Sequence, residues 1–262
     1  MDLNLAGRHA LVCGASEGIG RAAAHELALL GADVTVLARR PEALAEVAAA
    51  LPRVAAAQQH GAVSADVADT ATLRENVGRL VEARPVHILV NNTGGPPGGR
   101  ALDAGAEDYL AAFQHHLLAN QALARLTVPT MRAAGWGRIV NVVSTSVKEP
   151  IANLGVSNTI RGAVAGWAKT LSKELGADGI TVNNVLPGYT RTRRLEQILR
   201  DRVQATGKDA SAISAAMLAT VPAGRFAEAD EIAAAIAFLA SPAAGYITGV
   251  SLAVDGGRMQ SI

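Results

Sequence analysis

This chain has one cysteine, few aromatic residues and almost no net charge. The single cysteine, Cys13, cannot form an intrachain disulfide, so the sequence suits a reducing compartment and we expect a cytoplasmic protein. Aromatic residues make up only 3% of the chain, so the core must be built from Ala, Val, Leu and Ile. The 24 basic and 23 acidic residues leave a net charge of +1, which gives no sign of a nucleic-acid partner.

Long apolar runs are also missing. No stretch reaches the length of a membrane span, and the first five residues lack the charged start and apolar segment of a signal peptide. We therefore expect no membrane partner. Half of the 262 residues are hydrophobic, which is enough for a substantial core. Because no linker or shift of composition divides the chain, we expect a single domain over 1–262.

Short apolar runs alternate with helical patterns along the whole chain. The expected strands cover 9–13, 34–37, 62–65, 86–90, 138–143, 180–185 and 251–254. The expected helices cover 19–30, 41–51, 70–83, 107–133, 157–175 and 229–239. Continuous apolar strands are typical of parallel sheets covered on both faces. Right-handed crossovers then predict an α/β fold, a Rossmann-like doubly wound parallel sheet of about seven strands with helices on both faces.

One region departs from this alternation. Residues 189–221 are first arginine-rich, then polar and alanine-rich, and they lie between a strand and a helix. Insertions of this kind are often lids or binding loops, so we expect a substrate lid. A helical excursion with no ligand contact is the alternative.

Glycines cluster between the first strand and the first helix. Residues 13–20 read Cys-Gly-Ala-Ser-Glu-Gly-Ile-Gly. Glycine lets the backbone turn tightly and approach a pyrophosphate, which then sits at the helix N-terminus. The position at the start of a full βαβ unit makes this a strong signal for a dinucleotide. The expected contacts in this segment are Gly14, Ser16, Glu17, Gly18, Ile19 and Gly20.

At this motif the chain resembles the short-chain dehydrogenase/reductase family, and the resemblance extends over essentially the whole chain. Asn91-Asn92-Thr93-Gly94 is similar to the family's Asn-Asn-Ala-Gly motif, and Asp66-Val67 to its adenine-contacting pair. Pro187-Gly188 followed by Thr192 resembles its cofactor-holding turn. The resemblance implies cofactor contacts at Asp66, Val67, Asn92, Thr93, Gly94, Pro187, Gly188 and Thr192. Bacterial 3-oxoacyl-[acyl-carrier-protein] reductases are the nearest likeness.

The end of the second strand indicates which nicotinamide cofactor binds. A carboxylate there would favour NAD, whereas an arginine would favour the 2′-phosphate of NADP. This strand ends with Arg39 and Arg40, and a guanidinium matches a phosphate well. We therefore expect NADP with Arg39 as the main contact, and NAD as the alternative cofactor. Glu17 in the glycine loop would not help a 2′-phosphate.

The resemblance also implies a catalytic serine, tyrosine, lysine and asparagine, of which only the serine is present. Ser144 ends its strand as the family's serine does. Ser157 stands where the tyrosine would be, Arg161 where the lysine would be, and His116 at about the asparagine position. An aliphatic hydroxyl lacks the accessible pKa of a phenol, about 10, and arginine is always protonated. Arg161 could still hold the nicotinamide ribose or a substrate anion.

Other groups could supply the missing proton. His116 titrates in the useful range, Tyr189 follows the Pro-Gly turn, and Lys148 follows the serine strand. Each also has an ordinary interpretation: a packed helix histidine, a pocket filler and a solvated lysine. The histidines show no spacing that suggests a metal site, so we expect none.

The sequence therefore predicts an NADP-dependent oxidoreductase that moves a hydride between nicotinamide and a small carbonyl or alcohol substrate. Arg191, Arg193 and Arg194 at the start of the expected lid would suit an anionic substrate, such as an acyl thioester of CoA or a carrier protein. Two alternatives stay open: a nucleotide-binding protein without redox activity, acting as a sensor or assembly partner, and a non-redox lyase or isomerase. The resemblance also implies a homodimer or homotetramer that pairs through 107–133 and 157–175.

Overall fold

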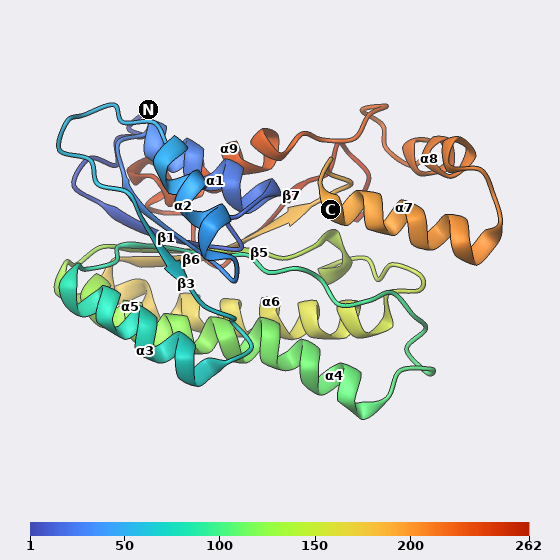
Figure 1. Ribbon diagram of the computed structural model, residues 1–262, viewed down its shortest axis with the longest axis horizontal. Coiled ribbons are helices and arrows are strands. Elements are labelled where there is room, and N and C mark those ends of the chain that lie inside the picture. Colours follow the sequence, from blue (N-terminus) through green and yellow to red (C-terminus); the bar gives the residue numbers. More distant parts are fainter. Residues whose placement is uncertain (262) are drawn as a thin grey trace.

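The computed structural model describes residues 1–261, in which seven strands form one parallel sheet of order β3-β2-β1-β4-β5-β6-β7. The strands are β1 (His9–Cys13), β2 (Asp33–Ala38), β3 (Gly61–Ser64), β4 (Ile88–Asn91), β5 (Gly137–Val142), β6 (Ile180–Pro187) and β7 (Ser251–Val254). Helices cover both faces of this sheet (Figure 1). The predicted Rossmann-like doubly wound fold is confirmed.

Each face of the sheet is covered by its own group of helices. In Figure 1, α1, α2 and α9 lie above the sheet, and α3, α5 and α6 lie below it. The α-helices are α1 (Gly18–Leu29), α2 (Pro41–Ala50), α3 (Thr70–Ala83), α4 (Ala106–Phe113), α5 (Ala119–Ala133), α6 (Gly155–Leu175), α7 (Arg193–Thr206), α8 (Ala210–Leu218) and α9 (Ala229–Ala240). No helix within residues 1–261 combines the length and the apolar character that crossing a membrane requires.

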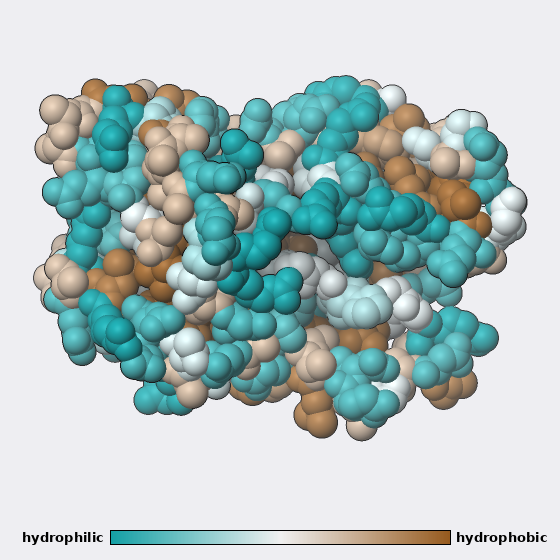
Figure 2. Space-filling model, in the orientation of Figure 1, coloured by the Kyte–Doolittle hydropathy of each residue, from teal (hydrophilic) through white to brown (hydrophobic). Residues whose placement is uncertain are grey.

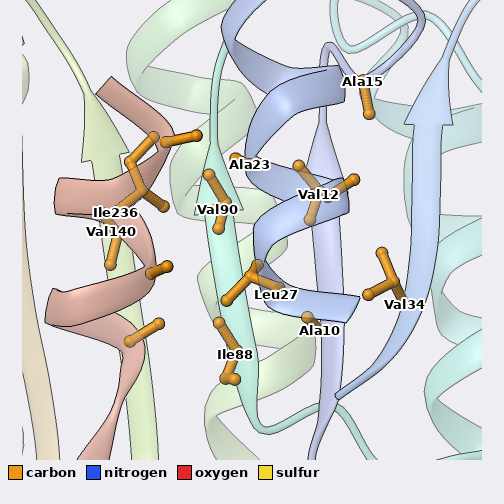
Figure 3. Close-up of a cluster of buried hydrophobic side chains, with 14 of the residues drawn as sticks. Ala10, Val12, Ala15, Ala23, Leu27, Val34, Ile88, Val90, Val140 and Ile236 are labelled. Atoms are coloured by element: carbon orange, nitrogen blue, oxygen red, sulfur yellow. The ribbon is translucent and has the colours of Figure 1, made fainter. Parts of the chain in front are cut away.

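The core is built from small and aliphatic side chains, as the scarcity of aromatic residues predicts. Leu27 of α1 and Ile236 of α9 pack on side chains such as Val90 and Val140 from the central strands (Figure 3). Alanines such as Ala23 bring α1 close to the sheet, and close approach of this kind gives the dense packing of protein interiors.

A buried row of polar side chains crosses four strands. Asn91, Asn141, Asn184 and Ser251 are register partners on β4, β5, β6 and β7. The Asn91 amide donates to Asn141 Oδ1 at 2.8 Å, and the Asn141 amide donates to Asn184 Oδ1 at 3.0 Å. The Asn184 amide donates to Ser251 Oγ at 3.1 Å. Because a shifted strand would leave these buried donors and acceptors without partners, the row favours the observed register of the strands.

The expected helical stretch over 107–133 is present, but it is not one regular α-helix. A π-helical turn, Gln114–Leu118, separates α4 from α5. The wider turn places His116 inside, where its Nδ1 lies 2.7 Å from Thr93 Oγ1. Widened turns of this kind often occur at functional sites.

The segment 189–221 forms the helices α7 and α8 at one end of the molecule (Figure 1). They have a small hydrophobic cluster of their own, which includes Leu195, Ile213 and Met217. Backbone hydrogen bonds hold the base of the segment: the Arg191 N–H donates to the Ala227 carbonyl, and the Ala227 N–H to the Tyr189 carbonyl. The function of this segment as a substrate lid stays a prediction.

The polar row can be tested by removing its central member. We expect Asn141→Ala to lower the free energy of unfolding by about 3 kcal/mol, because a buried donor and a buried acceptor lose their partners. Asn76→Ala, which removes a single hydrogen bond at the surface, should cost less than about 1 kcal/mol. Chemical denaturation of both variants checks this, and equal losses would mean that the row does not stabilise the sheet.

Candidate functional site

A cavity of about 1830 Å³ opens at the carboxyl ends of the strands, and the segments after β1, β2, β4, β5 and β6 line it together with α7 and α8. Single small-molecule sites occupy about 300–1,000 Å³, so this cavity has room for a dinucleotide and a second molecule. Hydrophilic side chains cover α7, and hydrophobic side chains gather where α8 lies (Figure 2). The site therefore lies where open α/β sheets bind ligands.

The glycine loop touches two other predicted motifs. Gly14 has φ +58°, and a Cβ there would lie 2.5 Å from the Asn92 carbonyl oxygen. Gly18 has φ +56°, and a Cβ there would lie 3.2 Å from Thr192 Cγ2. The Asn92 side chain donates to the Gly14 carbonyl at 3.2 Å. Side chains at these glycines would fill the space beside the helix start, so the loop needs glycine at both positions.

The start of α1 is free to bind an anion. Glu17 is the N-cap residue but makes no side-chain capping hydrogen bond, so the first N–H groups of the helix have no capping partner. Such groups, together with the helix dipole, favour a phosphate. The loop and this helix end thus fit the pyrophosphate of a dinucleotide.

Glu17 is held by two arginines. Its carboxylate pairs with Arg40 at 3.5 Å and with Arg193, at the start of α7, at 2.9 Å. Arg39 is exposed and has no carboxylate within ion-pair distance in the described part of the chain. The contrast leaves Arg39 as the unengaged guanidinium at the end of β2.

The cavity brings together nearly all of the predicted cofactor residues. Its wall includes Gly14, Ser16, Glu17, Gly18, Ile19, Arg39, Arg40, Asp66, Val67, Asn92, Thr93, Gly94, Pro187, Gly188 and Thr192. Gly20 is outside the wall. A Cβ on Gly20 would collide with the Gly14 carbonyl, so this glycine serves close packing within the loop.

Three of the four predicted catalytic positions line the same cavity: Ser144, Ser157 and Arg161. Ser144 caps a 3₁₀ turn, and its Oγ accepts a hydrogen bond from the Ser146 N–H at 3.1 Å. Its hydroxyl hydrogen is therefore available to a ligand oxygen. Arg161 Nη1 donates to the carbonyls of Val142 and Val143 at 3.1 and 2.7 Å. These bonds anchor the guanidinium to the end of β5.

The fourth position, His116, lies outside the cavity wall and contacts Thr93. Burial is the main cause that lowers its pKa to about 3, and the nearby charge of Arg161 lowers it further. The expectation that this histidine titrates in the useful range is therefore wrong. Of the other predicted donors, Tyr189 lines the cavity, whereas Lys148 is exposed and absent from its wall.

Sequence reasoning missed Arg258. Its guanidinium lies 4.5 Å from the ring centroid of Tyr189, and its Nη1 donates to Thr145 Oγ1 at 3.3 Å. Arg258 is 113 residues from Thr145 in the sequence, so no local motif could indicate this contact. Within residues 1–261 no group of three His, Cys, Asp or Glu residues is placed to hold a metal ion.

Comparison with known proteins gives one family. A family model described as enoyl-(acyl carrier protein) reductase matches residues 14–258. The 3-oxoacyl-[acyl-carrier-protein] reductase of Haemophilus influenzae is 35% identical over 258 residues, which cover 96% of this chain and 98% of that protein.

Comparison with solved structures also gives reductases. L-sorbose reductase from Gluconobacter frateurii, in complex with NADPH and L-sorbose, has a TM-score of 0.91 and 30% identity over 100% of both chains. A 3-oxoacyl (acyl-carrier-protein) reductase from Agrobacterium tumefaciens with NADP bound has a TM-score of 0.86 and 25% identity, over 97% of this chain and 95% of that chain.

The low pKa of His116 predicts a specific dependence of stability on pH. Its folded value of about 3 lies below the unfolded 6.5, so the unfolded chain binds the extra proton as the pH falls below 6.5. That one group then costs up to about 1.4 kcal/mol of unfolding free energy per pH unit. In His116→Asn, the decrease in the free energy of unfolding between pH 6.5 and pH 4.5 should be about 2–3 kcal/mol smaller than in the wild type.

Denaturation curves across that pH range check this prediction. His25→Asn, at an exposed position, is the matched control and should keep the wild-type slope. Some acid sensitivity should remain in every variant, because burial also lowers the pKa of His9 to about 4. An unchanged slope in His116→Asn would mean that His116 is not held neutral in the folded protein.

Proposed function

We propose, starting from the fact that this chain belongs to the short-chain dehydrogenase/reductase family, that it is an NADP(H)-dependent oxidoreductase acting on a carbonyl or alcohol group. The observation that carries the proposal is the single cavity that joins the glycine loop to Ser144, Ser157 and the segment 189–221. The relatives named above are reductases, and two of the solved ones hold NADPH or NADP.

NADP is favoured over NAD by the charge at the end of β2. Arg39 lines the cavity and is free of carboxylate partners in the described residues, whereas Arg40 is engaged with Glu17. A planar guanidinium can bind a 2′-phosphate through two hydrogen bonds. The nearby Glu17 would weaken the binding of that phosphate, but its pairing with Arg40 and Arg193 offsets its charge.

The cofactor, when bound, supplies or accepts the hydride. Ser144 orients the reacting carbonyl by donating its hydroxyl hydrogen to the carbonyl oxygen. Ser157, which lines the same cavity, can donate in the same way. Both hydroxyls stabilise the charge that develops on the oxygen, but neither titrates near neutrality, so the proton must come from another group.

Tyr189 is the phenol in the described cavity wall, and we assign the proton to it. Its ring is fixed in position: Phe226 packs edge-on with a centroid separation of 6.0 Å, and Arg258 lies over the ring. A phenol that is displaced from helix α6 to the turn after β6 would thus replace the missing tyrosine.

Two exposed leucines support an assembly. Leu110 on α4 and Leu118 at the π-helical turn are 69% and 40% exposed, large values for such apolar side chains. Contacts between copies through this helical run would bury them. A homodimer or homotetramer is therefore part of the proposal.

The catalytic assignments predict two kinetic losses. NADPH binding is measured first by titration calorimetry, followed by NADPH oxidation with a panel of carbonyl compounds. Ser144→Ala should lower kcat/KM by about 100-fold, because a hydrogen bond to the developing oxyanion is lost. Tyr189→Phe should lower kcat by about 100-fold while the Kd for NADPH stays unchanged. Tyr246→Phe, on a fully exposed tyrosine, is the control.

The outcomes separate the candidate functions. Full activity in Tyr189→Phe would place the proton donor elsewhere in the cavity. Tight NADPH binding with no turnover of any carbonyl would favour the non-redox binding protein, and turnover without net cofactor change would favour a lyase or isomerase. Absence of NADPH and NADH binding would overturn the proposed function itself.

The cofactor assignment has its own test. Arg39→Ala should raise the Kd for NADPH by about 10-fold or more and leave the Kd for NADH within about twofold, because only NADPH carries the 2′-phosphate. Arg53→Ala, at another exposed arginine that does not line the cavity, should change neither constant. Equal losses for both cofactors would contradict a 2′-phosphate contact.

A further inference from the structure

We infer that Arg161 and Arg194 form an anion-binding subsite around Gly95, in the substrate half of the cavity, which takes a carboxylate or phosphate group carried by the substrate. The inference rests on the proposed function in one respect: it names the class of carbonyl compound that the cavity accepts. The subsite itself is defined by the arrangement of charged groups and can be tested without turnover.

Two guanidinium groups from different helices meet at one point. A Cβ on Gly95 would lie 3.4 Å from Arg161 Nη2 and 3.5 Å from Arg194 Nη2. Arg161 comes from α6, and Arg194 from the first turn of α7. Gly95 does not have a positive φ, so its backbone conformation does not demand glycine. The missing side chain keeps the space between the two cations open.

Neither guanidinium has a carboxylate within ion-pair distance in the described part of the chain. Within residues 1–261 no ion pair includes Arg161 or Arg194. Arg161 Nη1 is satisfied by the carbonyls at the end of β5, and Arg194 Nη2 donates to the Pro96 carbonyl at 2.7 Å. Carbonyl groups orient the two cations but do not neutralise them. Two like charges held close together in a partly buried site cost free energy that a bound anion would offset.

The pKa shifts of Arg161 and Arg194 are consistent with two neighbouring cations in a partly buried site. Burial is the main cause that lowers the pKa of Arg161 to about 10, and the charge of Arg194 lowers it further. Burial also lowers the pKa of Arg194, while Asp201 on α7 acts in the opposite direction. The Asp201 carboxylate accepts a hydrogen bond from Gln197 instead of pairing with an arginine. With a pKa of about 10, Arg161 therefore remains charged at neutral pH.

The other two arginines at the start of the segment 189–221 are already paired. Arg191 contacts Glu228 at 3.0 Å, and Arg193 contacts Glu17 at 2.9 Å beside the glycine loop. Arg194, the next residue, points instead to Gly95 and Pro96. The cofactor side and the substrate side of the cavity are thus served by different arginines, and the subsite is distinct from the pyrophosphate cradle.

An arginine suits this position better than a lysine would. Its planar group can hold the backbone carbonyls with one nitrogen and a ligand oxyanion with another. The inference therefore gives Arg161 a binding function, and the cavity a preference for carbonyl compounds that carry a negative charge over neutral compounds of the same size.

Anion binding is tested by calorimetry on the NADP⁺-saturated protein, with oxalate and inorganic phosphate as separate probes. We expect one of them to bind, and Arg194→Gln to raise its Kd by about 10-fold, as expected for a lost charge-assisted hydrogen bond. The tighter probe identifies the substrate group as a carboxylate or a phosphate. No binding of either probe to the wild type, or binding only in the absence of NADP⁺, would overturn the subsite.

A second experiment needs neither substrate nor cofactor. Gly95→Asp places a carboxylate between the two guanidiniums, and Gly95→Asn places a neutral side chain of the same shape there. We expect the aspartate variant to melt about 3 °C or more above the asparagine variant, and both to lose oxalate and phosphate binding. Equal melting temperatures would show that the two cations need no anion.

The two experiments keep the failure of the subsite distinct from the failure of the proposed function. If NADPH does not bind, the proposed function fails. The Gly95 variants, and a weaker binding of the probes to Arg194→Gln than to the wild type in the cofactor-free protein, still decide whether the anion site exists. If NADPH binds and carbonyl compounds are reduced, but the aspartate and asparagine variants melt together, only the subsite is overturned.

Discussion

The pairing of β1 with β4 is the contact that positions the functional site, because it joins two segments whose following loops both approach the cavity. Ala10, Leu11 and Val12 are register partners of Ile88, Leu89 and Val90. The order of the sheet reverses at this pair, so the loops that follow the two strands diverge and leave a crevice. The Asn92 side chain donates to the Gly14 carbonyl and links the two loops across this crevice. Disturbing this pair would displace the glycine loop and the Asn-Asn-Thr-Gly motif together.

The buried polar row extends this order to the strands that carry the chemistry. The row runs from Asn91 on β4 to Ser251 on β7, through Asn141 and Asn184. Apolar side chains alone would tolerate a shift of two residues along a strand, because such a shift keeps the same face buried. Specific amide pairs do not tolerate it, since buried donors and acceptors would lose their partners. The row therefore fixes the positions of the residues at the ends of these strands. Those residues are Ser144, which follows β5, and the Pro-Gly turn at the end of β6.

Electrostatics separate the two halves of the cavity. In the proposed cofactor half, the Glu17 carboxylate pairs with Arg40 and Arg193, whereas Arg39 has no carboxylate partner in the described residues. In the substrate half, Arg161 and Arg194 are held by backbone carbonyls that carry no net charge. In the proposed mechanism, Arg161 at the position of the family's lysine supplies a cation that does not move protons. The proposed chemistry therefore uses hydroxyl groups together with the positive charge of Arg161.

The sequence by itself determined the fold and nearly all of the residues that line the proposed cofactor half of the cavity, whereas tertiary contacts decided most of the proposed substrate half. Apolar runs and glycine spacing are local properties, so they were sufficient to predict the parallel sheet and a glycine loop at the start of α1. The buried position of His116 depends on a π-helical turn and on Thr93, and the position of Arg258 depends on Tyr189. Nothing near these residues in the sequence indicates either contact. Adjacent helical residues point about 100° apart, so Arg193 and Arg194 face different halves of the cavity although their local sequence is the same. The direction of a long, flexible side chain is set by the charges and carbonyls that surround it, and only the folded chain brings those groups together.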